Sequence, residues 1–377
     1  MLAASKEDAA SFSAASFSAL SLEEDWDKPR GPPVVETKEA ILVENPRRFV
    51  LFPIEHNDIW QSYKAAEASF WNAEEIELHE DGTAFPNLHG KTRALLLHAV
   101  ALLATHDSLM GVDVTTKLSS EIQISEARCF FGFWAMQRNI HAEIATNLVD
   151  SFCSGEGRDF VFEAVRELPS TFKKTAWVQR HITDSSEHFS VRIISLALYV
   201  ATIQTSSLSL LLHIAKPADT SSPQPVSSRT CALPGLTHAV CKIVRDLSHY
   251  RRFAVQISRM LTSRPSTGLV HMIAKEAVEI ERQTVEDLVA LAGSSVDIAG
   301  QPLDAAAVTK KCQFEADVCL RELGYPPIVG GENPMQWIDT LVEAETRKGA
   351  KEGEKKVVKK QAPKMKAAQA FTIDEDF

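Results

Sequence analysis

The sequence lacks the cysteine patterns that mark zinc-binding modules and secreted, disulfide-rich domains. Its 377 residues contain six cysteines, and no two of them form a Cys-x-x-Cys pair. Neither a zinc knuckle nor a disulfide framework is therefore indicated, and a reducing compartment is the simpler expectation.

Long hydrophobic runs are also missing. A membrane-spanning helix needs at least about 18 largely apolar residues, and the longest candidate, residues 193–215, is interrupted by the polar stretch 204–207. This pattern favours a buried helix of a bundle, and we expect no membrane association.

The chain does not carry an excess of positive charge, since its formal net charge is −10. An acidic protein is repelled by nucleic-acid phosphates, so we expect no nucleic-acid partner. The first 43 residues are rich in serine and alanine but contain several acids, which disfavours an organellar transit peptide. We expect residues 1–43 to form a disordered arm and the protein to be cytoplasmic.

Strand-like patterns are few, whereas apolar residues recur at helical spacing over most of the chain. In residues 58–76, for example, Ile59, Tyr63, Ala66 and Phe70 follow one another at intervals of three or four. Further helices are expected over 92–110, 120–152, 160–169, 170–182, 193–215, 235–262, 267–292 and 304–323. With 45% hydrophobic residues to form a core, the sequence predicts one all-α domain over residues 44–345, organised as a large helical bundle.

Three segments depart from this helical pattern. Residues 216–232 are rich in proline, serine and threonine, which indicates a surface loop inserted between two core helices. Residues 346–370 are highly charged, so we expect a flexible linker there. The chain then ends in FTIDEDF (371–377), whose apolar residues among acids are typical of a peptide that docks in a groove on a partner. An acidic terminus without a function would have a similar composition.

The stretch WAMQRNIHAEIA (134–145) contains half of a metal-site pattern. In a helix, Arg138, His141 and Ala145 lie on one face, because residues three or four apart are neighbours. Di-iron carboxylate bundles use a Glu-x-x-His pair at this spacing, but an arginine stands here in place of the acid. Two readings remain open: a metal site with an unusual ligand, or a scaffold that has lost its metal chemistry.

Six stretches together resemble one family. They are ENPRRFVLFPIEHNDIWQSYKAAEASFWNAEEIELHED (44–81), EARCFFGFWAMQRNIHAEI (126–144), LPGLT (233–237), FEADVCLRELGY (314–325), ENP (332–334) and FTIDEDF (371–377). In this order they resemble the small subunit of class I ribonucleotide reductase, of the eukaryotic type. The resemblance implies a ferritin-like helical bundle, usually a dimer, with a di-iron centre and a tyrosyl radical. In that family the radical is passed to the large subunit, where ribonucleoside diphosphates become deoxyribonucleotides.

The resemblance also assigns the six ligand positions of the di-iron centre. Two of them keep a residue able to bind a metal, Asp107 and His141. The other four positions hold Arg138, Val200, Leu247 and Tyr250. We therefore expect Asp107 and His141 to be vestigial ligands, with no cofactor bound and no catalytic residue in this chain.

Two further possibilities concern this centre. Asp246 and His249 have the ligand spacing one residue before the family register, but such a shift turns a side chain by about 100° around a helix. We therefore expect them not to form a metal pair. Without metal, a buried Asp107 carboxylate needs compensation, and we expect an ion pair with Arg138. The alternative is an Arg138 side chain that extends to solvent.

The radical residue is replaced as well. The resemblance places the radical tyrosine at Ala145, which has no phenol to oxidise. The nearest tyrosine candidates on other helices are Tyr199 and Tyr250, and we expect the Tyr250 ring to fill the space of the missing ligands.

Part of the family's relay toward the large subunit is retained as Trp71, Asp246 and His141. We expect these three residues to serve packing rather than electron transfer, since a buried tryptophan bonded to an aspartate also ties two segments together. The family carries a relay tyrosine in its tail, whereas no tyrosine follows Tyr325 here.

The sequence therefore predicts a small-subunit component of ribonucleoside-diphosphate reductase that is itself non-catalytic. It would pair as a heterodimer with a metal-bearing small-subunit paralogue. It would bind the large subunit through Phe371, Thr372, Ile373, Asp374, Glu375, Asp376 and Phe377. The alternatives are a catalytically active metal-dependent subunit or oxidase with an unusual centre, and a regulator outside the reductase complex.

Overall fold

The computed structural model describes residues 39–361, apart from 154, 216–232, 294–295 and 299–300. The side chains of residues 107–113, 301 and 349–361 are also outside the description. Most of the expected N-terminal arm, the 216–232 loop and the terminal peptide 371–377 thus lie outside the described residues.

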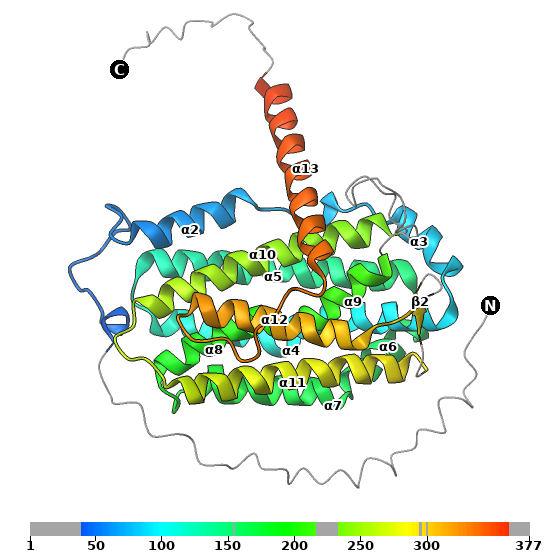
Figure 1. Cartoon of the computed structure of the whole chain (residues 1–377). Helices are drawn as coiled ribbons and strands as arrows, with labels where there is room; N and C mark the ends of the chain where they lie inside the picture. Colours follow the sequence, from blue (N-terminus) through cyan, green and yellow to red (C-terminus); the bar gives the residue numbers. More distant parts are fainter. Residues whose placement is uncertain (1–38, 154, 216–232, 294–295, 299–300, 362–377) are drawn as a thin grey trace, which may run out of the picture. The chain divides into compact units, whose positions relative to one another are not determined.

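The described residues are mostly helical, which confirms the predicted all-α fold (Figure 1). The α-helices are α2 (Asn57–Ala68), α3 (His79–Ala84), α4 (Gly90–Glu121), α5 (Ser125–Phe152), α6 (Glu156–Arg166), α7 (Pro169–Val178), α8 (Phe189–Thr202), α9 (Thr205–Ala215), α10 (Pro234–Arg259), α11 (Thr267–Leu291), α12 (Ala305–Glu322) and α13 (Gln336–Gln361). Short helical turns are η2 (Ala40–Leu42), η3 (Ala73–Glu75), η4 (Phe85–Asn87) and the π-helical η5 (Gln179–Thr183). A small antiparallel hairpin joins β1 (Asp297–Ile298) to β2 (Gln301–Pro302).

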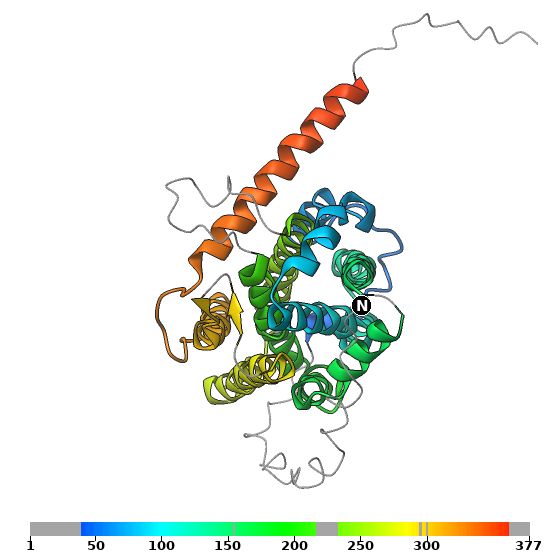
Figure 2. The same cartoon turned by 90° about the vertical axis from the view of Figure 1, so that its right-hand side faces the viewer.

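The long helices pack side by side around a shared apolar core. Helix α4 lies along α5, and α8 lies along α10, while α9 contacts both α4 and α10. Helix α2 packs on α5 and α10, and α11 and α12 both pack on α8 (Figure 2). Buried leucine, valine, isoleucine and alanine side chains of these helices form the core, as their helical spacing predicts.

The apolar segment predicted as one helix over 193–215 is divided into α8 and α9. Helix α8 ends at Thr202 and α9 begins at Thr205. By length and composition the segment Phe189–Ala215 could cross a membrane, but 89% of its apolar window is buried inside the protein. It therefore forms a core element of the bundle, as expected.

Two buried charged residues stabilise the break between α8 and α9. Lys174 donates from Nζ to the carbonyl oxygen of Ile203 at 2.9 Å. Glu281 accepts hydrogen bonds from the backbone N–H and the hydroxyl of Ser206, at 2.9 and 2.5 Å. The Lys174 ammonium and the Glu281 carboxylate also pair at 2.6 Å. Buried backbone groups need hydrogen-bond partners. Lys174 and Glu281 supply them for the Ile203 carbonyl and the Ser206 N–H at the interruption between the two helices.

A buried carboxylate anchors the extended segment that precedes α2. Glu126, in the first turn of α5, accepts two hydrogen bonds from the Arg48 guanidinium at 2.9 and 2.7 Å. The backbone N–H groups of Glu55 and His56 also donate to Glu126. These bonds fix residues 48–56 against the start of α5.

The region predicted as a flexible linker over 346–370 differs in part from the prediction. Helix α13 continues through Gln361, so residues 346–361 have helical backbone. Glutamate and lysine have high helix propensity, and Arg347 and Lys348 each pair with an acid one turn earlier. The apolar side of the first turns, Ile338 and Leu341, is buried in the core.

Candidate functional site

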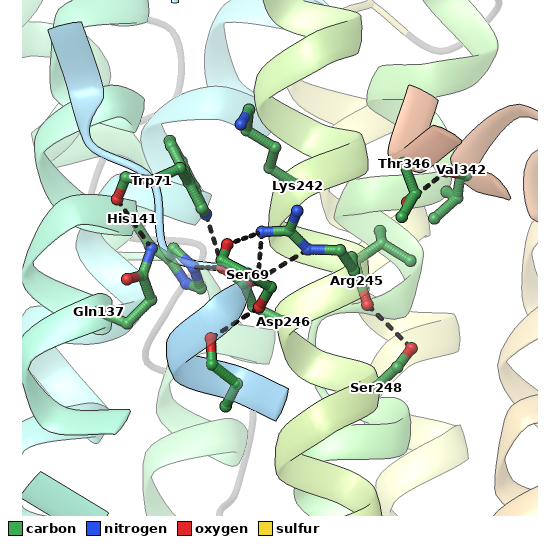
Figure 3. A network of polar contacts seen from close by, with 12 residues as sticks. Ser69, Trp71, Gln137, His141, Lys242, Arg245, Asp246, Ser248, Val342 and Thr346 are labelled. Carbon is green, nitrogen blue, oxygen red and sulfur yellow. Dashed lines mark hydrogen bonds and ion pairs between the residues drawn. The ribbon is translucent and has the colours of Figure 1, made fainter. Parts of the chain in front are cut away.

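Three residues of the predicted relay converge in the core of the bundle (Figure 3). Trp71 lies between α2 and η3, and its indole Nε1 donates to Oδ2 of Asp246 on α10 at 2.7 Å. The Nε2 atom of His141, on α5, lies 3.0 Å from the same carboxylate oxygen. The Trp71 and His141 rings stack with centroids 5.8 Å apart. The structure therefore joins these three residues around one carboxylate.

The second oxygen of the Asp246 carboxylate is held by Arg245. The guanidinium donates from Nε and Nη2 to Oδ1 at 3.2 and 2.9 Å, and Nη2 also donates to the carbonyl oxygen of Ser69 at 2.6 Å. Burial by itself would raise the pKa of Asp246, but the contacts with His141, Arg245 and Trp71 together hold it below its ordinary value. Asp246 is thus an ionised carboxylate that links α2, α5 and α10.

Aromatic rings surround the retained histidine. Tyr250 is buried and stacks on Trp134 with ring centroids 4.5 Å apart. Its ring lies 6.4 Å from that of His141, and Phe130 approaches it edge-on. The Tyr250 ring therefore packs beside His141, and its expected role of filling the space of missing ligands stays a prediction.

A second buried polar pair joins α4 to α8. Nε2 of His106 lies 2.9 Å from the hydroxyl of Tyr199, and the two rings stack with centroids 5.7 Å apart. The exposed fractions of the two residues are only 2% and 6%. His106 precedes the predicted ligand Asp107, whose own side chain lies outside the described part of the chain.

The remaining predicted positions divide between the core and a groove. Ala145 is fully buried in the apolar core, and Arg138 is also buried. Val200 and Leu247 line a groove of about 1400 Å³ that α12 and α13 also border. Because the Asp107 side chain is not described, its expected ion pair with Arg138 stays a prediction.

The described side chains of this region do not by themselves form a metal ligand set. Within the described residues, no group of three or more histidine, cysteine, aspartate or glutamate side chains is placed to hold a metal ion. The alternative pair of Asp246 and His249 does not act as a unit, because Asp246 is engaged by Trp71 and His141 whereas His249 lines the groove. Valine and leucine side chains have no donor atom, so Val200 and Leu247 cannot ligate a metal.

Sequence reasoning missed Arg245 and Gln137, which border the Asp246 network, and His106, which pairs with Tyr199. Gln137 donates from Nε2 to the carbonyl oxygen of Trp71 at 3.4 Å. Its position one turn before His141 was a usable signal, because both residues then share a helix face. A polar His106 inside the apolar helix pattern of residues 92–110 was another signal. The role of Arg245 depends on the approach of Ser69, which no local pattern contains.

Comparison with known proteins gives one family. The family described as "Ribonucleotide reductase, small chain" matches residues 48–334. Ribonucleoside-diphosphate reductase subunit M2 of Danio rerio is 32% identical over 307 residues, which cover 81% of this chain and 74% of the relative. The human subunit M2 is 32% identical over 304 residues, covering 80% of this chain and 73% of the relative.

Solved structures have the same fold. The ribonucleotide reductase Rnr4 homodimer from Saccharomyces cerevisiae matches with a TM-score of 0.68 and 28% identity, over 79% of this chain and 88% of that one. The dimanganese(II)-NrdF protein of Streptococcus sanguinis matches with a TM-score of 0.64 and 13% identity, over 80% of this chain and 100% of that one. The ferritin-like bundle expected from the sequence is thereby confirmed.

These comparisons correct the prediction that the chain uses no cofactor. That prediction was drawn from the replaced ligand positions, and it is wrong in the light of the family match, whose structural neighbours include a dimanganese(II) protein. The described side chains cover only part of the predicted metal centre, because the Asp107 side chain lies outside the described part of the chain.

Proposed function

Because the chain belongs to the ribonucleotide reductase small-chain family, we propose that it serves the ribonucleoside-diphosphate reductase complex as a non-catalytic small subunit. It pairs with a radical-bearing small-subunit paralogue and helps to join it to the large subunit. The observation that carries this proposal is the buried Ala145, a residue without an oxidisable group, which the resemblance assigns to the radical position.

The surroundings of Ala145 support this proposal. The residue is fully buried, and its neighbours Ile144 and Leu148 belong to the same apolar cluster. A radical site needs a phenol that loses an electron and a proton, and a methyl group in an apolar core can supply neither. This chain therefore makes no tyrosyl radical at the family's position.

The retained relay residues are consistent with a structural role. Trp71, His141 and Asp246 tie the segment after α2 to α5 and α10 through buried hydrogen bonds. Buried networks in which the polar groups are paired favour one packing arrangement of the helices. A subunit that acts by binding needs this rigidity whether or not an electron passes through it.

The pairing with the large subunit is proposed from the terminal peptide FTIDEDF, residues 371–377, which lies outside the described residues. A short apolar and acidic segment suits a groove on a partner. The heterodimer is proposed because a subunit without its own radical residue contributes to the reaction only beside one that has it.

A second candidate function is favoured by one observation, the buried pair of His106 and Tyr199. A phenol within hydrogen-bond distance of an imidazole can pass its proton to the ring when it is oxidised. In this candidate the chain is an active metal-dependent small subunit in which Tyr199 replaces the missing radical residue.

Co-purification tests the proposed function. The full chain is co-expressed with a small subunit that carries the radical tyrosine, and a tag on this chain is used for isolation. We expect the two subunits to elute together, and the complex to bind the large subunit. Recovery of this chain without the paralogue, at concentrations where the paralogue folds, would contradict the proposal.

Electron paramagnetic resonance separates the two candidates. The chain alone is supplied anaerobically with ferrous ammonium sulfate and then exposed to oxygen. We expect no tyrosyl-radical signal from the wild type. A stoichiometric signal that disappears in Tyr199→Phe, but persists in the matched variant Tyr63→Phe, would establish the second candidate instead.

A further inference from the structure

Helix α10 carries a stripe of basic residues on the side where it contacts α2 and α13. Its members recur at intervals of four and three residues, which places them on one face of the helix. They are His238, Lys242, Arg245, His249 and Arg252. This α10 stripe extends over about 21 Å, at 1.5 Å per residue, and all of it lines the groove of about 1400 Å³. Figure 3 shows Lys242 and Arg245 together with Val342 and Thr346 of α13, which line the same groove.

The positive charge of the α10 stripe is only partly compensated. Lys242 lies 3.5 Å from a carboxylate oxygen of Glu75, and Arg245 pairs with the buried Asp246. Arg252 is exposed and has no ion-pair partner within the described residues. An anion in the groove would therefore meet at least one free guanidinium.

The other acids that line the groove do not neutralise the stripe, because they lie on α12 and α13 and have partners there. Glu315 and Asp339 share the Lys311 ammonium at 2.7 and 3.0 Å. Glu343 pairs with Arg347 at 3.1 Å. The groove thus keeps a surplus of positive charge on its α10 side.

Apolar side chains line the groove beside the stripe. Phe70, just after α2, has an exposed fraction of 48%. Val342 of α13 and Leu247 of α10 are partly buried and pack against the core. A groove that joins basic and apolar side chains suits a ligand that is both acidic and apolar.

The terminal peptide FTIDEDF, residues 371–377, has this combination. In an extended chain alternate side chains face opposite sides. The three apolar residues of the peptide then share one side with Glu375, whereas Asp374 and Asp376 face the other side. Seven extended residues span about 23 Å, at 3.3 Å per residue, which is close to the length of the α10 stripe.

The chain that joins the groove to this peptide is long enough for the peptide to return. Helix α13 lines the groove as far as Arg347 and continues to Gln361, a further length of about 21 Å. Residues 362–370 span up to about 30 Å when they are extended. The peptide of one chain therefore reaches the groove of the same chain.

We propose that the groove along the α10 stripe is a docking site for the terminal peptide 371–377 of the same chain. Asp374 and Asp376 face the stripe, and the apolar side of the peptide packs on Phe70 and Val342. Because the peptide is tethered, its effective concentration is of the order of millimolar, and a weak contact is enough to hold it. One consequence rests on the proposed function: docking within the chain withholds the peptide from the large subunit and so regulates that contact.

A probe-binding experiment provides the main test. A fluorescein-labelled synthetic FTIDEDF peptide is titrated with the full chain and with a chain that lacks residues 371–377, and fluorescence anisotropy follows binding. We expect the shortened chain to bind the probe about tenfold or more tightly than the full chain, because its groove is unoccupied. The deleted residues lie outside the bundle helices, which end at Gln361, and circular dichroism checks that every chain is folded.

A charge reversal tests the contact with the stripe. In the shortened chain, Arg252→Glu should weaken probe binding about tenfold or more, because it replaces an attraction with a repulsion. A probe that carries Asp374→Lys and Asp376→Lys should bind this variant more tightly than it binds the unaltered shortened chain. Arg166→Glu, at an exposed arginine of α6, has the same change in net charge and should leave binding of the original probe unchanged.

An apolar variant keeps the proposal testable if Arg252→Glu fails to fold. Phe70→Ser should weaken probe binding about tenfold, since it removes an aromatic contact of the groove. Phe172→Ser, at a phenylalanine of α7 with an exposed fraction of 59%, is the matched control and should not change probe binding.

Large-subunit binding is measured separately, so the two proposals fail in different ways. In the full chain, Arg252→Glu should tighten large-subunit binding about tenfold if about nine-tenths of the peptides are docked in the groove. The probe assay contains no large subunit, and its failure therefore concerns the groove alone. Failure of the proposed function would instead appear as large-subunit binding that the deletion of residues 371–377 does not affect.

Four outcomes would overturn the proposed docking. One is equal probe binding by the full and shortened chains, or no binding to either at millimolar probe. Another is unchanged binding in both Arg252→Glu and Phe70→Ser. Binding that becomes tighter only after removal of residues 1–38 would assign the groove to that segment. A difference between full and shortened chains that disappears on dilution would place the peptide in the groove of another copy.

Discussion

At the scale of single residues, Asp246 organises the polar centre of the bundle. Its carboxylate accepts hydrogen bonds from Trp71 and Arg245 and lies within hydrogen-bond distance of His141. These partners come from three separate parts of the chain. An ionised group that is nearly fully buried is stable only when such partners surround it. The partners in turn lose their shared hydrogen-bond acceptor when the carboxylate is removed.

Replacement of this carboxylate should be strongly destabilising. Asp246→Asn removes the negative charge that compensates Arg245, and we expect the free energy of unfolding to fall by about 3 kcal/mol, as measured by urea titration. Asp150→Asn is the matched control, because Asp150 forms an exposed ion pair with Arg158 and should change stability by less than about 1 kcal/mol. Equal small losses in both variants would show that the network contributes little.

At the scale of the elements, two buried acids determine where helices begin and what packs on them. Asp81 accepts hydrogen bonds from the backbone N–H groups of Gly235 and Leu236, at 2.8 and 2.7 Å, and so satisfies the first turn of α10. Glu126 has a similar function for the segment before α2. In both cases a carboxylate meets N–H groups that a helix or a turn leaves without partners.

The start of α10 should tolerate no side chain at Gly235. An added Cβ would lie 2.4 Å from the carbonyl oxygen of Glu77 and 2.9 Å from Asp81 Oδ2. We expect Gly235→Ala to lower stability by about 2 kcal/mol through overpacking, measured as a loss in thermal and urea unfolding. Gly157→Ala, where nothing lies within 4 Å, should be neutral or slightly stabilising. A neutral Gly235→Ala would mean that α10 begins differently.

The anchor at Glu126 should make stability depend on pH. Burial alone would raise the pKa of Glu126, but the Arg48 guanidinium and the backbone N–H donors lower it from 4.5 to about 2. The stabilisation is therefore complete above pH 4.5 and is lost as the pH falls from 4.5 toward 2. Glu126→Gln should lose up to about 3 kcal/mol at pH 7, and this difference from the wild type should shrink below pH 4.5.

A control for this pH effect is Glu143→Gln on the same helix. Glu143 is exposed and has no ion-pair partner within the described residues. Its replacement should leave the stability of the folded chain unchanged at every pH. A constant difference between Glu126→Gln and wild type from pH 7 to pH 3 would contradict the assigned ion pair.

At the scale of the whole molecule, the proposed function gives the folded bundle and the terminal peptide separate tasks. The bundle is proposed to pair with another small subunit. The peptide 371–377 is proposed to contact the large subunit, and the highly charged residues 346–370 precede it in the chain. Loss of one contact should therefore leave the other.

Deletion of residues 371–377 tests this separation. We expect binding to the large subunit to weaken, and a single Phe377→Ala change to account for about 2 kcal/mol, or about thirtyfold in Kd, as buried aromatic anchors commonly do. Isothermal titration calorimetry measures this, and the small-subunit pair should be unchanged in ultracentrifugation. Undiminished large-subunit binding after the deletion would assign the docking site elsewhere.

The sequence by itself determined most of the helices and pointed to Trp71, Asp246 and His141 as a set, whereas the replaced ligand and radical positions stay predictions from the resemblance. Helical periodicity and side-chain type are properties of the chain alone, so α10 and α11 agree with the predicted ranges 235–262 and 267–292 within a few residues at both ends. Helix α4 instead continues to Glu121, beyond its predicted end at residue 110, and α5 begins at Ser125 rather than at residue 120. Helix α13 is an exception, because the sequence predicted a flexible linker over residues 346–370 from their charge alone. The glutamates and lysines of this segment also have high helix propensity, which the prediction did not take into account.

The tertiary structure alone decided which distant groups meet. His141 and Asp246 are 105 residues apart, and Glu281 reaches Ser206 across 75 residues to divide α8 from α9. The pairing of His106 with Tyr199, and the lining of one groove by Val200 and Leu247, also arise only from packing. A local pattern shows which face of a helix is buried, but the partner on that face depends on how the helices lie against one another.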